Sequence, residues 1–219
     1  MPAQALRQVY RHLAVSYGHL ARRDAEIDAY VNALSLEPDP VWRSVLLTNR
    51  AEALMAIGQL TAAVDGYRAA LSSLSQLEMR AGVTTLWGLA VALDRSGDLD
   101  EAMSSIRLAR AYDPADTQIR NRDVWTFDPE HDEHWYTALG YWSAARYAEL
   151  GAARAEWYGR AVTSWEEYIA AAPTDDRYLE LARVRLKQCQ KERDATQKRF
   201  KDPTSPAGRD NSARRRGRD

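Results

Sequence analysis

The chain of 219 residues has one cysteine, two phenylalanines and no long apolar segment. Its single cysteine, Cys189, cannot form an internal disulfide and lacks partners for a cysteine-based metal or redox motif. No window approaches the roughly 18 consecutive apolar residues that a membrane helix needs. Arg7, Arg11, His12 and His19 interrupt the apolar pattern of the first 20 residues, unlike a secretory signal. We therefore expect no membrane span and a cytoplasmic location, unless the chain is a processed fragment.

Glycine and proline are also scarce, at 11 and 8 residues, which leaves room for long helices. The aromatic residues are mostly 7 tryptophans and 11 tyrosines, rings that bury an apolar body and keep a polar tip. The net charge is −1, but residues 187–219 carry 11 Lys or Arg against 5 Asp or Glu, a net +6. The remainder therefore carries −7, which indicates an acidic body with a basic tail.

Three stretches align without gaps over 34 residues: 7–40, 44–77 and 83–116. Their starts lie 37 and 39 residues apart, so short insertions separate them. Large and small residues recur in one order through the third stretch: Leu86, Leu89, Ala90, Leu93, Gly97, Ala102, Ile106, Ala109 and Pro114. Equivalent places hold Tyr10, Leu13, Ala14, Tyr17, Tyr30, Ala33 and Pro38 in the first stretch. The second stretch has Leu47, Ala51, Leu54, Gly58, Ala63, Tyr67 and Ala70.

This pattern resembles the tetratricopeptide repeat family over about half of the chain. The resemblance implies pairs of antiparallel helices, with small residues where the two backbones approach closely. Gly58 and Gly97 would end the first helix of their pairs in the left-handed conformation, with Ala21-Arg22-Arg23-Asp24 replacing the glycine in the first pair. Glu26 stands where the family has a small residue and Arg50 where it has a large apolar one. We expect locally looser or rearranged packing at both.

The expected fold is all-α, a tetratricopeptide-like solenoid of helical hairpins closed by a capping helix. Residues 3–116 would form three repeats, 117–128 an irregular connection, and 129–173 a divergent fourth repeat with lengthened helices. Asp128 and Pro129 are suited to the start of that repeat. Residues 174–200 would form the polar capping helix that ends a repeat array, and 201–219 a disordered basic tail.

Candidate chemistry is sparse. His131 and His134 could share a helical face and bind a divalent ion, or they belong to an acidic first turn that complements the helix dipole. Zinc-binding helices place two histidines four residues apart, not three, which favours the second interpretation. No serine or cysteine stands in a nucleophile motif, and no glycine-rich phosphate loop is present. We expect no enzyme activity, no cofactor and no metal.

The family resemblance implies that the first helix of each pair lines a concave, partner-binding groove. Carried over by position, that groove would include Arg11, Val15, His19, Asn49, Glu52, Trp87, Asp94 and Arg95. Trp87 would be either an aromatic anchor for a peptide or a core residue. In chaperone-binding members a clamp of lysine, asparagine and arginine holds terminal carboxylates. Asn49 and Arg11 fit that clamp, but Val15, Thr84 and Gly88 do not, so chaperone binding is disfavoured.

The expected function is a scaffold or adaptor that holds a peptide or helix of another protein. The alternative is a structural subunit that associates with itself, or docks into a larger assembly, through the aromatic residues of 129–173. Packing against the capping helix is the interpretation we favour for most of those rings, which include Trp135, Tyr136, Tyr141, Trp142, Tyr147, Trp157, Tyr158, Trp165 and Tyr168. The cluster from Arg214 to Arg216 could bind nucleic acid through its guanidinium groups, but a charged tail is more often simply solvated. The lack of an interleaved aromatic residue further disfavours binding to a single strand.

Overall fold

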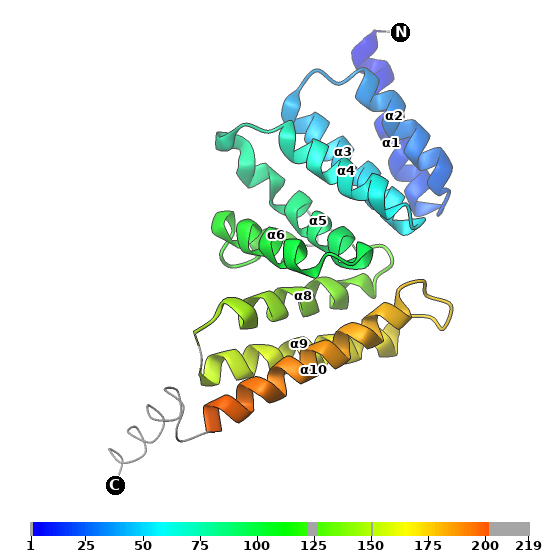
Figure 1. The fold of residues 1–219 in the computed structure, drawn as a ribbon. Coiled ribbons are helices and arrows are strands. Elements are labelled where there is room, and N and C mark those ends of the chain that lie inside the picture. Colours follow the sequence, from blue (N-terminus) through cyan, green and yellow to red (C-terminus); the bar gives the residue numbers. More distant parts are fainter. Residues whose placement is uncertain (1, 122–126, 150, 202–219) are drawn as a thin grey trace. The chain divides into compact units, whose positions relative to one another are not determined.

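The computed structural model describes residues 2–121, 127–149 and 151–201, and all regular structure within these ranges is helical. Helices pack in adjacent pairs along the chain (Figure 1). The chain divides into two compact units, Met1–Trp125 and Thr126–Asp219. None of the described helices combines the length and apolarity needed to cross a bilayer.

Three helical pairs form the first unit (Figure 1). They are α1 (Ala3–His19) with α2 (Arg23–Ser35), α3 (Pro40–Ala56) with α4 (Leu60–Ser72), and α5 (Val83–Ser96) with α6 (Leu99–Tyr112). Helix α2 also packs on α3, and α4 on α5, so each pair rests on the next. A 3-10 helix, η1 (Gln76–Gly82), joins α4 to α5, and a single turn, α7 (Thr117–Arg120), follows α6.

The turns inside the pairs need a left-handed residue. Gly58 and Gly97 have φ values of 80° and 103°, which confirms the predicted conformation. Gly97 ends α5, and the next residue, Asp98, donates its backbone N–H to Leu93 O at 2.9 Å. Ala21 takes the same role after α1 with φ 53°, a conformation that costs a non-glycine residue about 1 kcal/mol.

Small residues are buried at equivalent places of successive pairs. At equivalent places of the 34-residue register, six alanines are fully buried: Ala14, Ala51 and Ala90 in the first helices, and Ala33, Ala70 and Ala109 in the second. Gly88 is closer still to its neighbour, because a Cβ there would lie 2.6 Å from Cε1 of Tyr67. The Tyr67 ring is itself fully buried. Side-chain volume at these positions therefore sets the spacing between helices.

Glu26, the acidic residue at a small-residue position, is accommodated by its neighbours. It is only 6% exposed, and its carboxylate accepts a hydrogen bond from Arg23 Nη1 at 2.8 Å. Gly18 makes room for it, since a Cβ on that glycine would be 3.0 Å from Glu26 Oε1. The buried Glu26 carboxylate is thus paired with Arg23, and it occupies the space that a side chain on Gly18 would fill.

The second unit consists of α8 (Asp132–Tyr147), α9 (Ala152–Ala171) and α10 (Leu179–Lys201). Helix α9 packs on both α8 and α10 (Figure 1). Its core is aromatic: Trp135, Trp142, Trp165 and Tyr168 are all fully buried. The Trp135 ring meets those of Trp165 and Tyr168 edge to face, each at 4.9 Å between centroids, the geometry that aromatic pairs prefer.

Two helices begin later than the sequence suggested, and the expected irregular connection contains a helical turn. The final helix begins at Leu179 and not at 174, because the Asp176 side chain accepts the Tyr178 N–H and the Tyr168 hydroxyl and so holds a turn before the helix. Helix α8 begins at Asp132, three residues after the predicted start at 129, with a turn from Pro129 O to Asp132 N. The connection 117–128 contains the helical turn α7, where Thr117 and Gln118 bond the Asp113 carboxylate. The expected tail beyond Lys201 lies outside the described residues.

Replacing Gly88 by alanine tests the close approach of α4 and α5. The new methyl group would meet the buried Tyr67 ring at 2.6–2.8 Å, so we expect Gly88→Ala to destabilise the chain by about 1–3 kcal/mol despite the better helix propensity of alanine. Gly159→Ala in α9 is the matched control, since nothing lies within 4 Å of its Cβ position. It should be neutral or stabilising by up to about 1 kcal/mol. Urea unfolding followed by circular dichroism measures both, and equal effects of the two would contradict the assigned packing.

Candidate functional site

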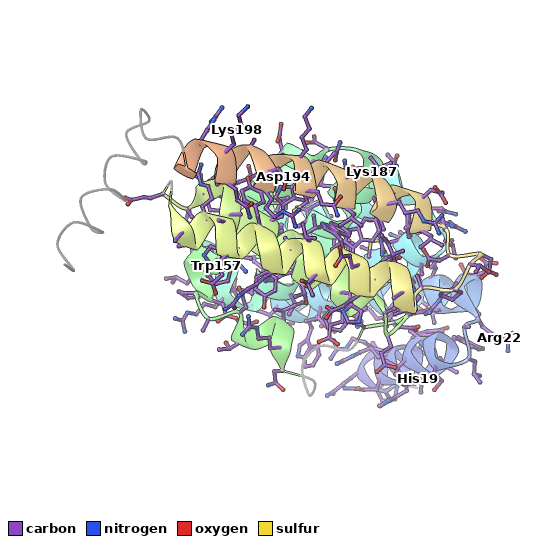
Figure 2. All side chains as sticks on the ribbon, turned by 90° about the horizontal axis from the view of Figure 1, so that it is seen from below. His19, Arg22, Trp157, Lys187, Asp194 and Lys198 are labelled. Carbon is purple, nitrogen blue, oxygen red and sulfur yellow. The ribbon has the colours of Figure 1, made fainter. Side chains whose placement is uncertain are left out.

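The predicted site residues of α1 lie on one helical face, at a spacing of four residues. Val15 is 48% exposed, His19 is exposed near the end of α1 (Figure 2), and Arg11 is half-buried. The guanidinium of Arg11 lies 3.8 Å from the centre of the Trp42 ring, at the start of α3. Trp42 is itself 45% exposed. An accessible cation–aromatic pair therefore joins the first helices of two successive pairs.

The predicted residues of α3, Asn49 and Glu52, are half-buried and face a tyrosine of α2. The pKa of Tyr30 is raised to about 12, mainly by burial. A hydrogen bond with the Asn49 side chain lowers it, and the nearby carboxylates of Glu26 and Glu52 add smaller upward contributions. Asn49 and Glu52 thus belong to a polar group between α2 and α3.

The predicted residues of α5 are buried. Trp87 is 3% exposed, Asp94 is fully buried and Arg95 is 7% exposed. Of the two interpretations of Trp87, this burial favours the core residue over the exposed anchor. The guanidinium of Arg110 lies 5.5 Å from the Trp87 ring centre. Only the α1 and α3 members of the predicted set therefore reach the surface of the described structure.

Helices α3 and α5 are joined by a polar contact. The hydroxyls of Thr48 and Thr85 lie 2.7 Å apart, and both residues are buried. Neither this pair nor the Arg11–Trp42 contact is visible in the sequence, because the partners belong to different repeats. The surface formed by Arg11, Val15, His19 and Trp42, with Asn49 and Glu52 beside Tyr30, is called here the α1–α3 face.

Most aromatic residues of the second unit are core residues. Besides the four fully buried rings, Tyr136 and Tyr158 are 4% and 5% exposed. Two rings lie nearer the surface: Tyr141 and Trp157 are half-buried and stack at 5.7 Å between centroids. Arg160 lies over both, 5.0 Å from the Trp157 ring and 5.8 Å from that of Tyr141. Tyr147 is 48% exposed.

Glu192 of α10 ties the three helices of the second unit together. Its carboxylate accepts hydrogen bonds from Trp142 Nε1 at 2.8 Å, from Arg146 Nη2 at 2.7 Å and from the Tyr158 hydroxyl at 3.0 Å. Burial alone would raise the pKa of Glu192, but the hydrogen bonds from Arg146 and Trp142 outweigh it and hold the pKa below its ordinary value. The cluster therefore contains an ionised carboxylate.

The cysteine and the two histidines of the second unit are buried or paired within the protein. Burial raises the pKa of the Cys189 thiol to about 12, so it is not a reactive thiolate at neutral pH. His131 Nε2 lies 3.1 Å from an Asp176 oxygen, and His134 Nδ1 lies 3.3 Å from a Glu167 oxygen. The two histidines thus contact different carboxylates. Within the described ranges, no three side chains of the metal-binding types come together.

Comparison with family models, with curated proteins and with solved structures found no match for the chain. The class that the structure defines is an all-α protein of helices packed in adjacent pairs.

Removing the charge of Glu192 tests the cluster. The pKa of Glu192 is depressed in the folded chain, so its stabilisation is fully present above the unfolded pKa of about 4.3 and is lost as the pH falls through the folded value. We expect Glu192→Gln to lower the free energy of unfolding at pH 7 by about 1–2 kcal/mol, a figure discounted because a third of the side chain is exposed.

The effect of Glu192→Gln should shrink toward pH 3. Asp194→Asn is the matched control, since Asp194 is exposed on the same helix (Figure 2) and should change stability by less than about 0.5 kcal/mol. Urea unfolding at both pH values, followed by tryptophan fluorescence, gives these numbers. A pH-independent difference between Glu192→Gln and the native chain would refute the assigned ionisation.

Proposed function

We propose that residues 3–116 form a solenoid of the tetratricopeptide type and that the chain is a non-catalytic scaffold or adaptor. Burial supports the repeat assignment. The six alanines at equivalent places of the register are all fully buried, and the predicted glycines end their helices with positive φ. Each pair also rests on the next, as repeats of a stacked array do.

The α1–α3 face is the proposed binding surface. The observation that carries it is the half-exposed Trp42 ring beneath the Arg11 guanidinium, with the exposed Val15 four residues along α1. Tryptophan and arginine are the residues most often found at the energetic centre of protein interfaces. Trp42 thus takes the anchor role that the sequence suggested for Trp87. The partner is a peptide or helix that covers an aromatic anchor beside polar groups.

The second candidate is a structural subunit that associates through the second unit. It is favoured by the stacked Tyr141 and Trp157 rings with Arg160 over both, and by the exposed Tyr147. Trp142 does not contribute to such a surface, because it is fully buried and donates its indole N–H to Glu192. Trp157 is therefore the residue whose replacement tests this candidate.

A photo-crosslinking amino acid placed at Val15 tests the α1–α3 face directly. In the native cell it should trap a protein partner, and the same probe at Asp65, an exposed residue of a second helix, should not. The combined variant Arg11→Ala with Trp42→Ala should weaken capture of that partner by about tenfold or more, because it removes an aromatic and arginine anchor.

The matched control for the double variant is Asp28→Ala with Asp65→Ala, which changes two exposed residues of α2 and α4. It should leave capture unchanged. If the partner binds the double variant as tightly as the native chain while circular dichroism shows both folded, the α1–α3 face is not the binding surface. If Trp157→Ala alone abolishes capture, the second candidate is correct.

A further inference from the structure

Helix α1 and the residue that ends it, Leu20, carry an apolar stripe that the described structure leaves largely exposed. Leu6, Leu13 and Leu20 recur at a spacing of seven residues, and Val9 lies between the first two. Leu20 is 67% exposed, Val9 42% and Leu13 37%, while Leu6 is half-buried. A seven-residue apolar repeat is the pattern of a helix that packs along another helix. These four residues are called here the α1 stripe.

Two of the stripe's places are buried in later repeats, the place of Val9 in both and the place of Leu13 in the third. Val9 corresponds to Leu46 in α3 and Thr85 in α5, each 2% exposed, and Leu13 corresponds to Leu89, which is 5% exposed. In those pairs the second helix of the preceding pair packs on this side, α2 on α3 and α4 on α5. The α1 stripe is therefore the surface on which a further helix would pack. Its exposure leaves an apolar surface on the first helical pair of the described array.

Charge decides which helix can cover the stripe. Helix α1 has no acidic residue. Its two arginines are used elsewhere: Arg7 lies 3.2 Å from a Glu37 carboxylate oxygen, and Arg11 stacks on Trp42. The exposed residues beside the stripe include Ala5 and Ser16, which carry no charge. An uncharged apolar stripe is complementary to itself, so two copies can pair about a two-fold axis without like-charge repulsion.

Two other occupants from the same chain fit poorly. The outer side of α10 carries Lys187, Asp194 and Lys198 (Figure 2), and placing these charges on an apolar stripe would desolvate them without partners. Residues 202–219 contain no apolar side chain larger than that of alanine and proline, and so offer little to bury. From the exposure and the charge pattern together, we infer that the α1 stripe binds the α1 stripe of a second copy of this chain, in an isologous dimer.

The geometry of the dimer follows from the stripe. In an antiparallel pair the two-fold axis passes near Leu13, which faces Leu13 of the second copy, while Leu6 faces Leu20. The dimer leaves Val15 and His19 on a different side of α1, because residues two and six positions from Leu13 point away from the stripe. Dimerisation and the proposed function of the α1–α3 face are therefore separable by mutation.

Sedimentation equilibrium of the full chain tests the inference. The native chain should show a concentration-dependent dimer. Leu13→Glu with Leu20→Glu should raise the dimer dissociation constant by about tenfold or more, because it places carboxylates of both copies in an apolar contact. Trp157→Ala and Val184→Glu, the latter at an apolar residue of α10 with 48% exposure, are the controls and should leave the dimer intact. Circular dichroism confirms that the variants stay folded.

Oxidative cross-linking provides a second measurement that does not depend on weakening the fold. Leu13→Cys should form a disulfide-linked dimer, whereas Gln8→Cys, exposed on another side of the same helix, should not. The native Cys189 is fully buried and does not interfere. The inference is overturned if the native chain stays monomeric at about 100 μM. It is also overturned if the dimer is lost in Trp157→Ala but kept in the Leu13→Glu, Leu20→Glu variant.

Discussion

Close approach between paired helices is the constraint on which the first unit depends. Two helices can pack at short range only where one presents almost no side chain, and the six fully buried alanines of the register provide this in every pair. The same closeness is found between successive pairs, where the Tyr67 ring of α4 occupies the space of the missing Cβ of Gly88 in α5. Larger side chains fill the space between the helices, and the second helix of a pair packs on the first helix of the next pair, α2 on α3 and α4 on α5.

Two carboxylates within the packing, Glu26 and Glu192, are paired with arginines. Glu26 replaces a small residue, yet Arg23 pairs with it and Gly18 makes room for it. Glu192 collects hydrogen bonds from Trp142, Arg146 and Tyr158. A paired, hydrogen-bonded carboxylate recovers much of its desolvation cost, whereas removal of one partner would leave a buried charge. The cores of the two units differ, since the first is mainly aliphatic and the second is built around Trp135, Trp142, Trp165 and Tyr168.

The described surfaces differ in the partners that they suit. The α1–α3 face combines an accessible tryptophan and arginine with polar neighbours, a mixture suited to a peptide or helix of another protein. The α1 stripe is apolar and uncharged, and suits a copy of itself. The outer side of α10 is charged (Figure 2), which suits contact with water. Under the two proposals, binding of a partner and of a second copy would use different surfaces of the chain.

The sequence by itself determined the helical pairs, the alanine contacts and the left-handed glycines Gly58 and Gly97, because these depend on residues close together in one repeat. Tertiary structure decided the rest. Trp87, Asp94 and Arg95 occupy places that the repeat pattern assigned to a binding surface, yet they are buried, and Trp42 became the accessible ring instead. The start of α10 at Leu179 depends on a bond from Tyr168 to Asp176. Burial and such contacts join segments distant in sequence, and local periodicity carries no information about which distant side chains meet.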